Sequence, residues 1–267
     1  MNDQTVGLTN EEYELSASDK FASLFTEPSK LFSDLSHQKP KTTDWLIPLI
    51  VLMVLAMSVQ VLILNSPKLK YQAAQEQMGT VETLLDDAVT KGQMTQEQAD
   101  QRLEEVADRV DKQMNAGLLI GVVTIIIFSF LFFFVVSGVF ILIVKFGLKG
   151  EGAYNAGLTA YGLPGYIMAL QLIITIILML VMGDIKIGTD VTKLLGLNIK
   201  KISGYLLSYI DPIKIWFYVV VGVAFAKMFK SNRTGLYVST VLSVWFLFGI
   251  AFWGLAQVVP VFQFMIR

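Results

Sequence analysis

Residues 116–144 read AGLLIGVVTIIIFSFLFFFVVSGVFILIV, a stretch without a single charged side chain. Four other apolar stretches of nearly comparable length occupy residues 45–64, 161–182, 213–229 and 236–259. About twenty helical residues cross a ~30 Å hydrocarbon core, and a helix satisfies its own backbone hydrogen bonds in lipid. The sequence therefore predicts an all-α, polytopic membrane protein built as a bundle of five transmembrane helices.

The composition agrees with a membrane protein and excludes several other classes. Of the 267 residues, 54% are hydrophobic and only 16% are charged, whereas about a quarter is usual in soluble domains. The net charge of −1 provides no basic surface for nucleic acid. The chain has no cysteine, and its one histidine is His37. We therefore expect no disulfide, no metal site, no cofactor and no nucleic-acid partner.

No catalytic motif is present. The sequence contains neither a nucleophile elbow nor a phosphate-binding or dinucleotide-binding glycine motif. Asp184, Asp190 and Asp211 lie in a predicted loop, whereas an intramembrane aspartyl dyad needs two buried aspartates. We therefore expect that the protein is not an enzyme. Only a convergence of Tyr161, Asp211 and Lys214 in one pocket would support enzymatic activity.

The N-terminal region changes from polar to amphipathic. Residues 1–20 predict a disordered acidic tail, and residues 21–44 predict a pre-membrane amphipathic helix with Pro28 in a first turn. Its apolar face and flanking lysines suit a helix lying on an anionic membrane surface. The alternative is that this face packs against the protein's own loops. The side chains expected to attach to the membrane are Phe25, Leu31, Phe32 and Leu35.

A hydrophilic insert at residues 65–115 separates the first two apolar stretches. It carries two helical patterns, and the second is preceded by a capping-box sequence that starts at Thr95. Its carboxylates alternate with arginine and lysine, which is typical of a solvated helix face rather than a metal site. The insert predicts an extramembrane helical hairpin, and its second arm is expected to run straight into the second span. It would either dock a partner or simply pack on itself, through Leu84, Leu85, Leu103, Val106 and Val110.

Other local patterns bear on packing and orientation. Small residues at the spacing that favours close helix contact occur at Gly117 and Gly121, and at Gly222 and Ala226, for packing within the chain or for dimerisation. Residues 184–211 show short amphipathic patterns expected at the interface. The cations of the short loops favour a cytoplasmic N-terminus and an external C-terminus.

Three stretches carry a resemblance to a known family: FTEPSKLF at 25–32, YNAGLTAYGLP at 154–164 and DPIKIW at 211–216. In this order they resemble the Yip (Ypt-interacting protein, Yip-one domain) family of integral membrane proteins, from about Phe21 to Trp253. The charged insert is similar to that of many bacterial members. The residues that match the family pattern, expected to have structural roles, are Pro28, Tyr154, Tyr161, Pro164, Asp211, Pro212, Trp216, Gly222 and Trp245.

The resemblance implies a non-catalytic, five-span membrane domain over residues 45–259, followed by a tail at 260–267. Eukaryotic relatives bind prenylated small GTPases, but the Asp-Leu-Tyr-Gly-Pro signature of that branch is absent here, so we expect no small GTPase partner. Residues preceding the domain also lack the cysteine-rich ribbon of some relatives.

The resulting hypothesis is a scaffold or adaptor in membrane organisation. Its partners would be the lipid bilayer and either other membrane proteins or a second copy of itself. The expected location is a bacterial cytoplasmic membrane, or a Golgi or endoplasmic-reticulum membrane if the chain is eukaryotic. The competing hypothesis is a permease, or a membrane subunit of a transport system, for a neutral or lipidic solute. A polar cavity lined by Gln60, Gln171 and Gln257 would support transport.

Overall fold

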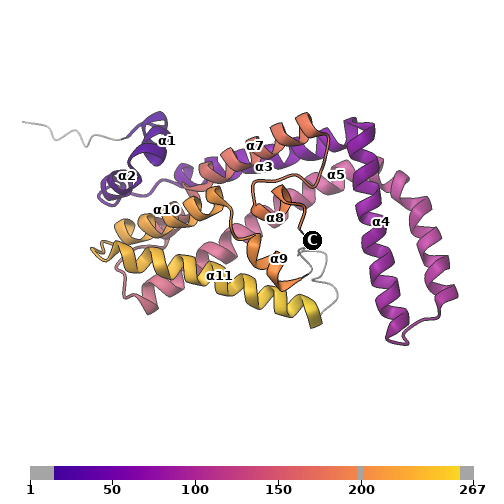
Figure 1. Ribbon diagram of the computed structural model, residues 1–267. Coiled ribbons are helices and arrows are strands. Elements are labelled where there is room, and N and C mark those ends of the chain that lie inside the picture. Colours follow the sequence, from indigo (N-terminus) through magenta and orange to yellow (C-terminus); the bar gives the residue numbers. More distant parts are fainter. Residues whose placement is uncertain (1–14, 198–200, 259–267) are drawn as a thin grey trace, which may run out of the picture.

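The computed structural model describes residues 15–197 and 201–258, without the side chains of residues 108 and 110–119. The described residues form eleven α-helices, one π-helical turn and the connections between them (Figure 1). In chain order the elements are α1 (Ala17–Thr26), α2 (Pro28–Leu35), α3 (Thr42–Asn65), α4 (Pro67–Thr90), α5 (Gln96–Leu142), η1 (Ile143–Gly147), α6 (Tyr154–Gly162), α7 (Gly165–Met182), α8 (Val191–Leu194), α9 (Ile202–Leu207), α10 (Pro212–Met228) and α11 (Thr234–Val258).

Four helical segments are long and apolar enough to cross a membrane: Thr42–Asn65, Ile120–Gly147, Tyr154–Met182 and Thr234–Val258. The remaining predicted span, at residues 213–229, corresponds to α10, which has only 17 residues. At ~1.5 Å per residue α10 is about 25 Å long, less than the ~30 Å core. The prediction of five spans is therefore not confirmed. Asp211 and Pro212 begin α10 and Phe229 ends it, and the helix between them is shorter than the hydrocarbon core.

Helix α10 is the centre of the bundle. It packs against α2, α6, α7 and α11. A helix that is apolar all round is expected to be buried in this way. Its fully or nearly fully buried residues are Phe217, Val220, Val221, Gly222, Ala224, Phe225, Ala226 and Met228.

The predicted small-residue pairs lie in contacts within the chain wherever they are described. A Cβ at Gly222 would lie 2.5 Å from the Cα of Val238 on α11, so only glycine allows α10 and α11 to approach this closely. Ala226 is fully buried. Gly121 faces the side chain of Gln60 on α3. Gly117 belongs to α5, but its surroundings lie outside the described residues.

Helices α1 and α2 form a small unit at one end of the bundle (Figure 1). Helix α1 begins at Ala17, before the boundary at residue 21 that the sequence predicts, because Ser16 and Asp19 form a capping box. The side chains expected on the membrane surface face the protein instead. Leu31, Phe32 and Leu35 are buried in the core and Phe25 is partly buried against it, so attachment to lipid through them would require α2 to leave α10.

Residues 65–115 form a helical hairpin that stands off the other end of the bundle (Figure 1). Thr95 and Gln98 make the capping box that the sequence predicts at the start of α5. The helix then continues without interruption to Leu142, so the second arm of the hairpin and the second span are one helix.

We expect Gly222→Ala to destabilise the protein by about 1–3 kcal/mol, the usual cost of overpacking, because the backbone of Val238 leaves no room for a methyl group. Thermal unfolding in detergent measures this. Gly138→Ala is the matched control, since a Cβ there meets nothing within 4 Å. Equal melting temperatures for the two variants would contradict the close helix approach.

Candidate functional site

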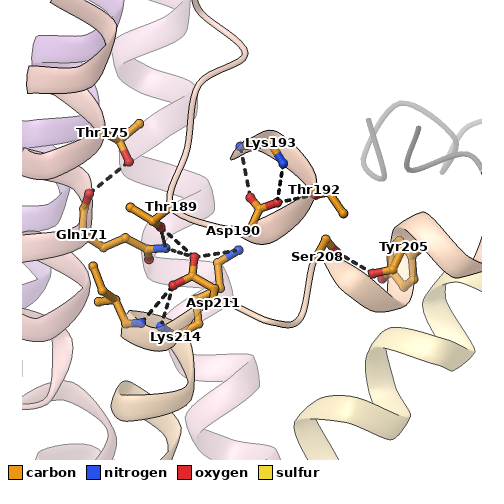
Figure 2. Close-up of polar contacts among 11 residues, drawn as sticks. Gln171, Thr175, Thr189, Asp190, Thr192, Lys193, Tyr205, Ser208, Asp211 and Lys214 are labelled. Carbon is orange, nitrogen blue, oxygen red and sulfur yellow. Dashed lines mark hydrogen bonds and ion pairs between the residues drawn. The ribbon is translucent and has the colours of Figure 1, made fainter. Parts of the chain in front are cut away.

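A buried polar cluster joins α7, the connection after it and the start of α10 (Figure 2). Gln171 Nε2 donates to the Asp211 carboxylate at 2.6 Å and lies 2.8 Å from the Thr189 hydroxyl. Thr189 Oγ1 donates to the same carboxylate oxygen at 2.7 Å. Asp211 is fully buried. The cluster thus ties three segments together through one carboxylate.

The second carboxylate oxygen of Asp211 caps α10. It accepts the backbone N–H groups of Ile213 at 2.9 Å and Lys214 at 3.2 Å, while Pro212 occupies the first turn. A negative charge at a helix N-terminus is favourable, and Lys214 Nζ lies 3.9 Å from the other oxygen. These donors compensate a charge that would be costly to bury alone.

Asp190 makes a similar arrangement beside it (Figure 2). Its carboxylate accepts the Thr192 hydroxyl and the backbone N–H of Lys193, and so caps α8. The Lys193 ammonium lies 4.0 Å away. The backbone N–H of Val191 donates to the carbonyl of Ile210 at 3.2 Å, which fastens α8 to the residue before Asp211. Among the described residues, no group of three or more His, Cys, Asp or Glu side chains forms a candidate metal site.

The contact with Gln171 sets the depth of this cluster. Gln171 stands about 16 Å from the C-terminal end of α7 at ~1.5 Å per residue, roughly half of a ~30 Å core. Thr189 and Asp211 therefore lie well back along the bundle from the end of α7, not at the membrane interface where sequence analysis expects this connection. Sequence reasoning assigned Asp211 to a loop and missed this depth. The available signal was an Asp-Pro pair before an apolar stretch too short to span, together with a glutamine in mid-span.

A second buried ion pair holds the N-terminal unit. Lys20 Nζ on α1 lies 2.7 Å from the carboxylate of Asp44 in the first turn of α3, and both side chains are buried. The aromatic rings of Phe21 and Phe25 pack against Tyr166 and Trp216 with centroids 5.1 and 5.6 Å apart. A cavity of about 310 Å³ lies beside the pair. This pair fixes α1 and α2 on the bundle.

The other residues of the family pattern do not gather in one place. Tyr161 packs among phenylalanine rings, including Phe133 and Phe217, and takes no part in the Asp211–Lys214 pair. Pro28 opens α2, Tyr154 is exposed at the start of α6, and Pro164 precedes α7. On α11, Trp245 stacks on Tyr218 of α10 at 4.4 Å.

The three glutamines proposed to line a transport cavity also take separate places. Gln60 faces Gly121, Gln171 binds Asp211, and Gln257 is exposed and donates to the carbonyl of Trp253.

We expect Asp211→Ala to lower the free energy of unfolding by at least about 2 kcal/mol, because it removes a helix cap and leaves buried donors without an acceptor. Thermal unfolding in detergent measures the loss. Asp184→Ala is the matched control on the same connection, where the carboxylate meets only the exposed backbone N–H of Lys186. A loss no larger than that of the control would contradict the anchoring role of Asp211.

We expect Lys20→Met to release α1 and α2, because a buried carboxylate left without its partner costs about 3–5 kcal/mol. Limited proteolysis of the connection between α2 and α3 measures the release. The double variant Lys20→Met with Asp44→Leu should regain most of the protection. Lys30→Met, which removes only an exposed pair with Glu27, should change nothing. Equal cleavage of all variants would show that the pair does not hold the unit.

Comparison with known families matches residues 22–256 to the Yip1 domain. No curated protein and no solved structure matches the chain. The Yip1 domain family consists generally of non-enzymatic proteins of transport and trafficking. Because the match covers most of the chain and four helical segments can span a bilayer, this chain belongs to the Yip1 domain family and is an integral, multi-pass membrane protein.

Proposed function

We propose that this protein is a non-catalytic membrane adaptor whose packed bundle presents the α4–α5 hairpin to a membrane partner. The observation that carries this proposal is the hairpin itself, which projects from one end of the bundle and has no other helix beside its outer part (Figure 1). A projecting arm without a role in the core is suited to reach a second protein.

The base of the arm is fixed in direction. The side chain of Gln72 on α4 donates to the carbonyl of Gly183 and accepts from the backbone N–H of Ile185, each at 3.1 Å. An ion pair between Glu76 and Lys186 adds a second contact at 2.5 Å. A pre-oriented arm loses less freedom when it binds than a flexible one.

The two faces of the hairpin differ. Leu84, Leu85, Leu103 and Val106 are half-buried on two helices that pack against each other, and the side chain of Val110 lies outside the described residues. The outer faces carry exposed acids such as Glu82 and Glu105. The apolar side chains therefore hold the arms together, while their exposed edges and the acidic faces are available to a partner.

The packing of the bundle favours an adaptor over a permease. Helix α10 is buried on all sides in its centre, and the three mid-span glutamines lie apart. A path for a polar neutral solute would need a few polar groups that converge on one cavity.

The adaptor role predicts a specific protein neighbour at the hairpin. Photo-crosslinking probes at the exposed positions Glu82 and Glu105 should capture the same protein in native membranes, identified by mass spectrometry. A probe at Ile177, which is exposed on the apolar surface of α7, is the control and should label lipid. Crosslinks from the hairpin only to lipid or to the chain itself would contradict the proposal.

The fixed base predicts a role for Gln72. We expect Gln72→Ala to weaken the crosslink from Glu105 several-fold while the melting temperature of the membrane domain stays nearly unchanged, because only the direction of the arm is lost. Gln75→Ala is the matched control, since its side chain bonds only to Tyr71 on the same helix. An unchanged crosslink would show that the direction of the arm does not matter for docking.

A further inference from the structure

An apolar groove of about 710 Å³ lies between α9, α10 and α11. Its lining is aliphatic or aromatic except for Ser203. Helix α10 begins only at Pro212, and the six-residue helix α9 comes just before it in the chain. The outer faces of α10 and α11 are therefore not covered by a full-length helix, and this leaves the groove. The side chains that form it include Leu206, Ile210, Ile215, Leu242, Trp245 and Phe246.

The groove opens at membrane depth. Trp245 stands about 17 Å from the start of α11 and about 20 Å from its end, at ~1.5 Å per residue. Helix α11 is one of the four candidate spans. The exposed parts of Ile210, Ile215 and Phe246 at the rim of the groove therefore meet bilayer hydrocarbon, where an occupant without polar groups is favoured.

The walls of the groove are held in place by contacts made inside the protein. The ring of Tyr209 packs on Trp245 and Phe246 with centroids 4.9 and 5.5 Å apart. Its hydroxyl lies against the backbone of Gly249, where a Cβ would overlap it, and 3.2 Å from the Tyr205 hydroxyl, which donates to the Gly249 carbonyl.

We propose that this groove holds the hydrocarbon chain of a bilayer lipid more persistently than the plain outer surfaces of the bundle do. Its volume falls within the ~300–1,000 Å³ of ordinary ligand pockets, and its preformed walls avoid the cost of rearrangement on binding. An α-helix about 10–12 Å across would enter such a space for no more than about two turns, whereas a single chain follows it. The inference does not depend on the adaptor role.

Tryptophan fluorescence tests this proposal on the full chain. The chain has four tryptophans, and a variant with Trp45→Phe, Trp216→Phe and Trp253→Phe keeps only Trp245 in the groove. A reference variant replaces all four with Phe and adds Leu180→Trp on the exposed face of α7. Both are reconstituted in vesicles of phosphatidylcholine with brominated acyl chains, which quench a nearby indole, and are then exchanged into lipid-free detergent.

We expect both reporters to be quenched in the vesicles, but only the groove reporter to keep most of its quenching after the exchange. Ile215→Phe, at a partly exposed position of the lining, should abolish this retention by filling the groove. Ile177→Phe, on the exposed face of α7, should leave it unchanged.

Two results would overturn the proposal. If the fluorescence of the groove reporter recovers after the exchange as fully and as fast as that of the reference, the groove holds only ordinary boundary lipid. If it is not quenched in the vesicles at all, a protein segment, from this chain or from a second one, occupies the groove instead.

Discussion

The carboxylate of Asp211 is the interaction on which the arrangement of this protein depends. In a bilayer every backbone polar group needs a partner inside the protein, and Asp211 supplies one oxygen to the first turn of α10 and the other to Gln171 and Thr189. It thereby fixes where α10 begins and ties Thr189 to the middle of α7. The cap of α8 by Asp190 and the contacts of Tyr205 and Tyr209 with α11 then complete the arrangement beside the groove.

Hydropathy located the membrane helices but not the path between them. The apolar stretches correspond to four candidate spans and to α10, and the capping box at Thr95 marked the start of α5. The count of five is not confirmed, because apolar composition says nothing of the ~25 Å length that Asp211 and Phe229 leave to α10. The polar cluster was missed because Gln171 and Asp211 are distant in sequence and only the fold brings them together.

The N-terminal unit shows a second limit of sequence patterns. An amphipathic helix has the same periodicity whether its apolar face meets lipid or protein, so Leu31 and Phe32 were compatible with both. The structure places them in the core against α10, and the ion pair between Lys20 and Asp44 joins the same unit to the start of α3. Neither residue is distinctive in sequence, since a lysine and an aspartate on separate helices reveal nothing of their pairing.

The continuity of α5 has a mechanical consequence. From Gln96 to Leu142 it is one uninterrupted helix of 47 residues, with one part beside α4 and the other beside α3 and α6, and it changes direction where it passes from the hairpin into the bundle (Figure 1). Because no loop separates the two parts, a displacement of the hairpin would be passed along a hydrogen-bonded backbone into the intramembrane part of the same helix.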